Sequence, residues 1–138
     1  MNIYFSAAIR GGRAEQPTYK IIAEALATHG TVLTDHIADE TLTQRGETEL
    51  TDKEIYMREM ERIGSADIVV TELSVPSLGV GYVLGRALQL KKTVLAVYQG
   101  AHSDNLSAMI KGDARITVVT YQTDEELVNA IDAFFKNN

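Results

Sequence analysis

In the stretch Asp67-Ile-Val-Val-Thr-Glu-Leu-Ser-Val-Pro-Ser-Leu-Gly-Val-Gly-Tyr-Val-Leu-Gly-Arg86, an apolar run typical of a buried strand leads into a glycine-rich turn and then a helix. An apolar run with a glycine-rich turn also occurs in Ile3-Tyr-Phe-Ser-Ala-Ala-Ile-Arg-Gly-Gly-Arg13. If the two runs are neighbouring parallel strands, their turns lie at one edge of the sheet. Backbone N–H groups of both turns then line one cleft, which is suited to a phosphate.

Strand and helix patterns alternate along the chain. The expected strands cover 2–8, 31–34, 67–73, 93–98 and 116–121, and the expected helices cover 14–29, 52–63, 79–90 and 124–135. This alternation predicts an α/β fold: a single doubly wound, Rossmann- or flavodoxin-like domain over residues 1–138. We expect a five-stranded parallel sheet in the order 2-1-3-4-5, whose switch point lies between the first and third strands.

Composition limits the classes of partner. The net charge of −6 argues against a nucleic-acid polymer or an anionic membrane surface as the main partner. The absence of cysteine removes disulfides, thiolate chemistry and Cys-type metal sites. The sequence has neither a membrane-span pattern nor a signal-peptide pattern, so a cytoplasmic location is expected.

Each glycine-rich turn has a structural and a functional interpretation. Arg10-Gly-Gly-Arg13 is either a phosphate-binding turn before a helix or a tight turn with two solvated arginines. In the second turn, Ser77 either caps the following helix or donates to the same anion, and Gly79 lets the backbone approach it. The residues alone leave both interpretations open.

Four motifs in order resemble one family over nearly the whole chain: IYFSAAIRGGR, IYMREMERI ahead of ADIVV, PSLGVGYVLGRA, and LSAMIKG. They are similar to the 2'-deoxynucleoside 5'-monophosphate N-glycosidases of the nucleoside 2-deoxyribosyltransferase-like superfamily. The resemblance implies hydrolysis of the N-glycosidic bond of deoxynucleoside 5'-monophosphates to free base and deoxyribose 5-phosphate. It also implies a homodimer with shared active sites and no metal or organic cofactor.

The same resemblance implies roles for the first and third motifs. The substrate would be surrounded by Ala7, Ile9, Arg10 and Gly11. Its 5'-phosphate would be held by Ser77 and Gly79, joined by Ser107 from the partner subunit.

The reacting groups implied by the resemblance are Tyr4, near the sugar, and Glu59, which would protonate or orient the leaving base. Glu59 stands where relatives have Asp. His36 is either a wall of the base site or a partly exposed loop residue. No two of the three histidines have the spacing of a metal site.

Val83 departs from the family pattern, because the nucleophilic glutamate of GVGYELGRA belongs at that position. Valine can neither attack C1' nor carry a charge. Three interpretations remain open. The chain hydrolyses the bond with another carboxylate, Glu59 or the weaker candidate Glu72; or it is a silent nucleotide-binding protein, through natural or engineered loss of the nucleophile; or it is a deoxyribosyl transferase.

Overall fold

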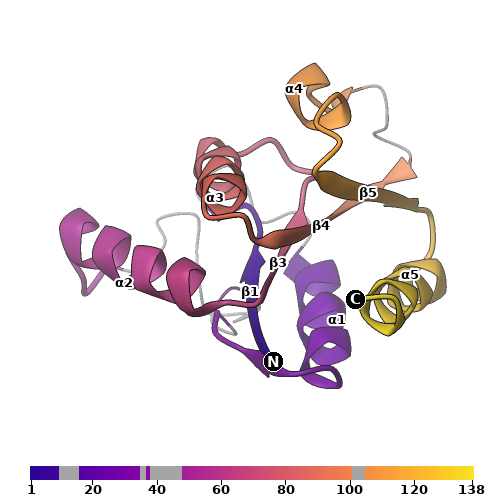
Figure 1. The fold of residues 1–138 in the computed structure, drawn as a ribbon, viewed down its shortest axis with the longest axis horizontal. Coiled ribbons are helices and arrows are strands. Elements are labelled where there is room, and N and C mark those ends of the chain that lie inside the picture. The colour runs from indigo at the N-terminus through magenta and orange to yellow at the C-terminus, as the bar shows by residue number, and fades with distance from the viewer. Residues whose placement is uncertain (10–15, 35–36, 38–47, 101–104) are drawn as a thin grey trace.

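A computed structural model describes residues 1–9, 16–34, 37, 48–100 and 105–138. Its centre is a five-stranded parallel sheet in the order β2-β1-β3-β4-β5 (Figure 1). This confirms the predicted doubly wound α/β fold and strand order. The strands are β1 (Asn2–Ser6), β2 (Thr31–Val32), β3 (Ile68–Glu72), β4 (Thr93–Gln99) and β5 (Ile116–Tyr121).

The switch point lies where the sequence predicts it. β1 pairs with β3 in parallel, from Ile3 opposite Ile68 to Ser6 opposite Thr71. All five residues of β3 are buried, as expected for a central strand covered on both faces. The connections that follow β1 and β3 therefore leave the same edge of the sheet.

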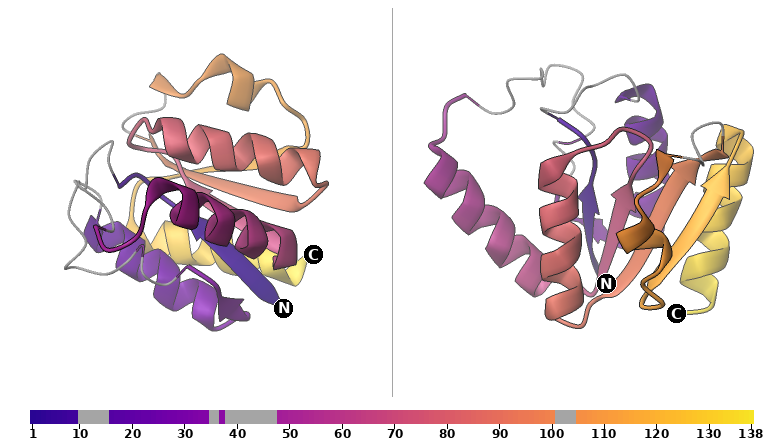
Figure 2. Two further views of the ribbon diagram at one scale, coloured as in Figure 1. Left: turned by 90° about the vertical axis from the view of Figure 1, so that its left-hand side faces the viewer. Right: turned by 90° about the horizontal axis from the view of Figure 1, so that it is seen from above.

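Helices cover both faces of the sheet. α1 (Gln16–Ala27) and α5 (Asp124–Lys136) pack on one face, and α2 (Asp52–Ser65) and α3 (Leu78–Gln89) lie on the other (Figures 1 and 2). Each face has its own apolar cluster. The cluster at α1 and α5 includes Phe5 and Val70, whereas the cluster at α2 and α3 includes Tyr4 and Val69. Successive strand residues thus serve opposite faces.

Side-chain caps fix the helix ends. α2 starts with a capping box in which Thr51 and Glu54 exchange hydrogen bonds. α3 ends with a Schellman motif: the Lys91 N–H donates to Leu88, the Lys92 N–H donates to Ala87, and Lys91 has a φ of 56°. The Lys92 ammonium also donates to the carbonyls of Gly64 and Ala66, 2.7 Å from each, at the end of α2.

Several boundaries differ from the predicted ones by one or two residues, and one short helix was not predicted. β1 ends at Ser6 rather than at residue 8. β2 stops after two residues because the Thr34 hydroxyl then bonds to both the N–H and the carbonyl of Phe5, in place of a backbone ladder. The short helix α4 (Ala108–Lys111) was not predicted, since it buries none of its residues. Within the described ranges, no helix has the length and apolarity needed to cross a bilayer.

Candidate functional site

Tyr4 and Glu59 form the polar centre of the face covered by α2 and α3. The Tyr4 hydroxyl donates to Glu59 Oε2 over 2.7 Å. Tyr4 projects from the interior strand β1 and is 4% exposed, and Glu59 reaches it from the third turn of α2. The structure therefore brings together two residues that the sequence resemblance assigned to the reacting centre.

Two arginines of α2 complete the surroundings of Glu59. Glu59 Oε1 lies 2.7 Å from the guanidinium of Arg58 and 3.0 Å from that of Arg62. The Glu59 side chain is only 15% exposed. As an ionised carboxylate it only accepts hydrogen bonds, and both of its oxygens have donors. This arrangement suits a base or an electrostatic partner of developing positive charge better than a proton donor.

The Tyr4 phenol is held in its neutral form. Burial raises its pKa well above the ordinary value of 10.0, and the charge on Glu59 and the hydrogen bond to it raise the pKa further. Arg62 and Arg58 act in the opposite direction without cancelling the rise. Tyr4 is therefore a hydrogen-bond donor throughout the neutral range, which favours orientation of Glu59 over proton transfer.

Val83 lies in α3, half-buried against the apolar cluster that also contains Tyr4. Its side chain adds no charge or hydrogen bond to this face. Glu59 is thus the carboxylate that the described residues place beside Tyr4.

The second candidate carboxylate, Glu72, points to the opposite face. It follows Ile68 and Val70 in the alternation of β3, and Tyr121 from the cluster at α1 and α5 contacts it. Glu72 is fully buried. The sheet separates it from the Tyr4–Glu59 pair, so the interpretation of Glu72 as a reacting carboxylate is not supported by its placement.

The predicted phosphate turn after β3 leads directly into a helix N-terminus. Ser77 is the N-cap of α3, and its hydroxyl accepts from the Val80 N–H over 3.4 Å. Gly79 lies in the first turn, where a Cβ would come no closer than 3.8 Å to another atom, the Ser77 hydroxyl. Packing therefore does not require glycine there, and the space beside its Cα is open to a ligand or a partner.

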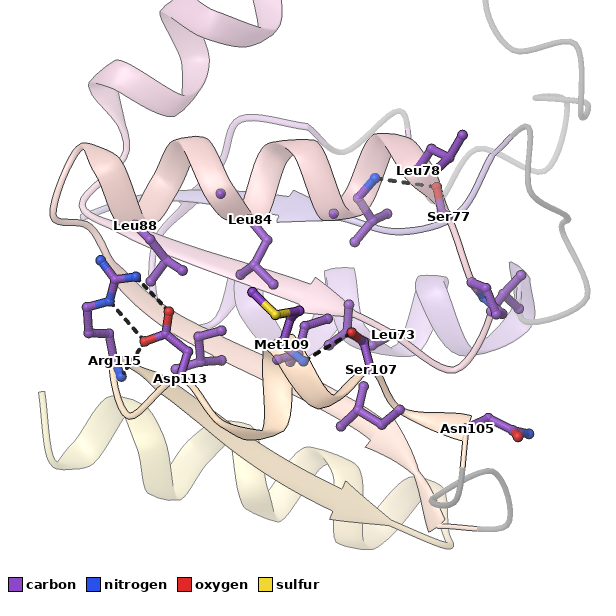
Figure 3. Close-up of a pocket in the computed structure, with 18 of the residues that line it drawn as sticks. Leu73, Ser77, Leu78, Leu84, Leu88, Asn105, Ser107, Met109, Asp113 and Arg115 are labelled. Carbon is purple, nitrogen blue, oxygen red and sulfur yellow. Dashed lines mark hydrogen bonds and ion pairs between the residues drawn. The ribbon is translucent and has the colours of Figure 1, made fainter.

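Ser107 caps α4, on the far side of a groove from α3. Its hydroxyl accepts from the Met109 N–H over 3.3 Å. The groove has a volume of about 1030 Å³ and is lined mainly by apolar side chains, with Ser77 and Ser107 among its polar groups (Figure 3). Leu84 and Leu88 point into it from α3. Tyr4, Glu59 and Val83 do not line this groove, so it is distinct from the Tyr4–Glu59 pair.

The residues expected around the substrate in the first loop are only partly described. Ala7 is buried and Ile9 half-buried, and both pack with the cluster at α1 and α5. Arg10, Gly11 and His36 lie outside the described residues. Among the residues that the structure describes, no group of three acidic, histidine or cysteine side chains could hold a metal ion.

Sequence reasoning missed Arg58 and Arg62 as members of the site. Their signal was present, since both lie within one helical turn of Glu59 on the same helix. Charged residues at such spacing normally indicate a solvated helix face, and that interpretation does not predict their contact with a half-buried carboxylate.

The fold defines a doubly wound α/β protein, and its candidate site lies beside β1 and β3, the strands at the switch point of the sheet. The chain belongs to the nucleoside 2-deoxyribosyltransferase family, whose pattern matches residues 3–131.

Relatives are similar over most of their length. The 5-hydroxymethyl-dUMP N-hydrolase of Mus musculus is 41% identical over 139 residues, covering 98% of this chain and 80% of the relative. The enzyme of the same name from Danio rerio is 37% identical over 138 residues, covering 99% and 96%. The solved structure of the Clostridium botulinum CMP N-glycosidase BcmB superposes with a TM-score of 0.69 at 15% identity, covering 97% of this chain and 99% of that one. The last similarity shows the fold.

Proposed function

We propose that this protein hydrolyses the N-glycosidic bond of 2'-deoxynucleoside 5'-monophosphates, releasing the base and deoxyribose 5-phosphate. The names of the relatives support this class of reaction. The single observation that carries it is the 2.7 Å bond from Tyr4 to a half-buried Glu59. A carboxylate held in one orientation can stabilise an oxocarbenium-like sugar or activate the water that attacks it.

Val83 determines which mechanism of hydrolysis is open to the protein. Without a carboxylate at this position, the covalent glycosyl-enzyme of a retaining glycosidase has no nucleophile to form it. We assign Glu59 the role of general base: it accepts a proton from a water whose oxygen attacks C1'. The C1'–N bond breaks, its electron pair leaves with the nucleobase, and the nucleobase is protonated from solvent. A single displacement of this kind inverts the configuration at C1'.

The 5'-phosphate would be bound at the start of α3. Ser77 and the free N–H groups of the first turn, at Gly79, offer donors at the positive end of the helix dipole. Arg10 and Gly11 of the first loop would join them. This assignment needs no metal or organic cofactor.

We further propose a homodimer formed through the groove between α3 and α4. Leu78 and Met109, which line the groove, are 96% and 83% exposed. A Cβ added at Gly81 or Gly85 would meet nothing within 4 Å, so the wall contributed by α3 is smooth. A partner seated there would bring its Ser107 toward the phosphate site. We propose that the protein is located in the cytoplasm.

The test measures free-base release from a panel of deoxy- and ribonucleoside 5'-monophosphates. The unmodified protein is assayed beside Val83→Glu, Glu59→Gln and the double variant. Release by the unmodified protein that is lost in Glu59→Gln supports Glu59 as the reacting carboxylate. Release by Val83→Glu alone refutes hydrolysis by the unmodified protein.

The second candidate function is a nucleotide-binding protein without chemistry, which Val83 itself favours. Loss of a nucleophile typically lowers a rate by several orders of magnitude while leaving binding groups in place. Calorimetric binding of a deoxynucleoside monophosphate without base release supports this candidate. Appearance of a new nucleoside when a second free base is added would instead indicate a transferase.

A further inference from the structure

Glu72 is a fully buried carboxylate that the proposed chemistry does not use. Ser74 donates both its backbone N–H, over 3.0 Å, and its hydroxyl to Glu72 Oε1. The Tyr121 hydroxyl lies 3.4 Å from the same oxygen. A buried charge is costly unless hydrogen bonds compensate it, and these donors stabilise the Glu72 carboxylate inside the protein.

The contacts of Ser74 extend this network to the neighbouring strand. Its hydroxyl accepts from the Gln99 N–H at the end of β4 over 2.9 Å. The adjacent Leu73 N–H donates to the Val97 carbonyl over 3.0 Å. Because Tyr121 ends β5, Glu72 and Ser74 tie the carboxyl ends of β3, β4 and β5 together.

The tied segment leads straight into the proposed phosphate site. Only Val75 and Pro76 separate Ser74 from Ser77, the N-cap of α3, and Pro76 has a fixed φ. With so short a connection, the position of Ser74 sets where the first turn of α3 begins.

We propose that Glu72, acting through Ser74, is a positioning residue that fixes the N-terminus of α3 for the 5'-phosphate of the nucleotide. The inference rests on the proposed function, because it assigns the phosphate to this helix end. It gives the buried carboxylate a role in substrate affinity from the opposite face of the sheet.

The test compares two ligands that differ only in the phosphate. Dissociation constants for 2'-deoxyuridine 5'-monophosphate and for 2'-deoxyuridine are measured by calorimetry in the unmodified protein, Ser74→Ala, Glu72→Ala and Glu72→Gln. Leu127→Ala is the matched control, since it truncates a buried side chain of α5 on the same face of the sheet. Amide hydrogen exchange of residues 73–80 is measured without ligand in each protein.

We expect Ser74→Ala and Glu72→Ala to bind the nucleotide about tenfold more weakly, and the nucleoside within about twofold, as for loss of a hydrogen bond to a charged group. Glu72→Gln keeps an acceptor oxygen for Ser74 and should recover most of the affinity. Amide exchange in residues 77–80 should rise in the two alanine variants and stay unchanged in Leu127→Ala.

Equal losses for both ligands, or the same selective loss in Leu127→Ala, would refute the positioning role. If the unmodified protein binds neither ligand, the proposed function fails, and the exchange measurement decides the positioning role alone. Unchanged exchange in Ser74→Ala and Glu72→Ala would then overturn it. Should Glu72→Ala not fold, Ser74→Ala carries the same comparison.

Discussion

The hydroxyl of Tyr4 donates a 2.7 Å hydrogen bond to Glu59 across 55 positions of sequence, joining β1 to α2. Since Arg58 and Arg62 hold the other carboxylate oxygen, Glu59 is fixed from three directions. A carboxylate that is already oriented loses little conformational freedom when a substrate arrives.

The first prediction concerns Tyr4 at alkaline pH. Its pKa in the folded protein lies above the unfolded value of about 10, so the neutral phenol stabilises the fold below that pH, and this contribution disappears as the pH rises above it. The unfolding free energy of the unmodified protein should fall more steeply above pH ~10 than that of Tyr4→Phe. Urea unfolding between neutral and alkaline pH measures the difference, and parallel curves would contradict it.

The second prediction concerns Val83. Its apolar side chain should let the protein hold an intact deoxynucleotide more tightly than Val83→Glu, because a carboxylate there would repel the phosphate. We expect Val83→Glu to raise the dissociation constant for 2'-deoxyuridine 5'-monophosphate a few-fold. Val83→Gln separates charge from size and should resemble the valine protein. Tighter binding of the nucleotide by Val83→Glu in calorimetry would contradict this prediction.

The third prediction concerns the groove between α3 and α4. If two copies meet there, Met109→Lys places an ammonium in an apolar interface and should shift the protein to monomer in sedimentation velocity. Met57→Lys is the control, since Met57 is also exposed but lies on α2 outside the groove. A monomeric parent protein at micromolar concentration would count against the shared site and against the role of Ser107.

The fourth prediction concerns the end of α3. Lys91 adopts the left-handed conformation of a Schellman motif, which costs a residue with a Cβ about 1 kcal/mol relative to glycine. Lys91→Gly should therefore raise the unfolding free energy by up to ~1 kcal/mol, measured as a higher urea midpoint. Lys91→Ala removes the same charge and keeps the strain, so it should show no such gain.

The fold was predictable because its signals are local. The apolar run of β3 and the spacing within α3 placed both elements to within a residue or two. α3 starts at Leu78, one residue earlier than expected, directly after its N-cap Ser77. The short helix α4 has no such pattern, since none of its residues is buried.

The site was predictable only in part. Tyr4 and Glu59 were identified by resemblance, and their hydrogen bond follows from a pairing that no local pattern encodes. The contacts of Glu72 with Ser74 and Tyr121 depend on which face each strand residue occupies, and that depends on where β3 begins. A shift of one residue would have sent Glu72 toward Glu59.

The strand order has a consequence for how the chain folds in time. β1 is made early but lies inside the sheet, between β3 and a β2 of only two residues. The pairing that buries β1 must wait until β3 has emerged from the ribosome, because β2 alone offers two residues of ladder. Until then the apolar residues of β1 stay available to chaperones or to a neighbouring nascent chain. β1, an interior strand of the finished sheet, is therefore without its β3 partner until the later part of the chain has been made.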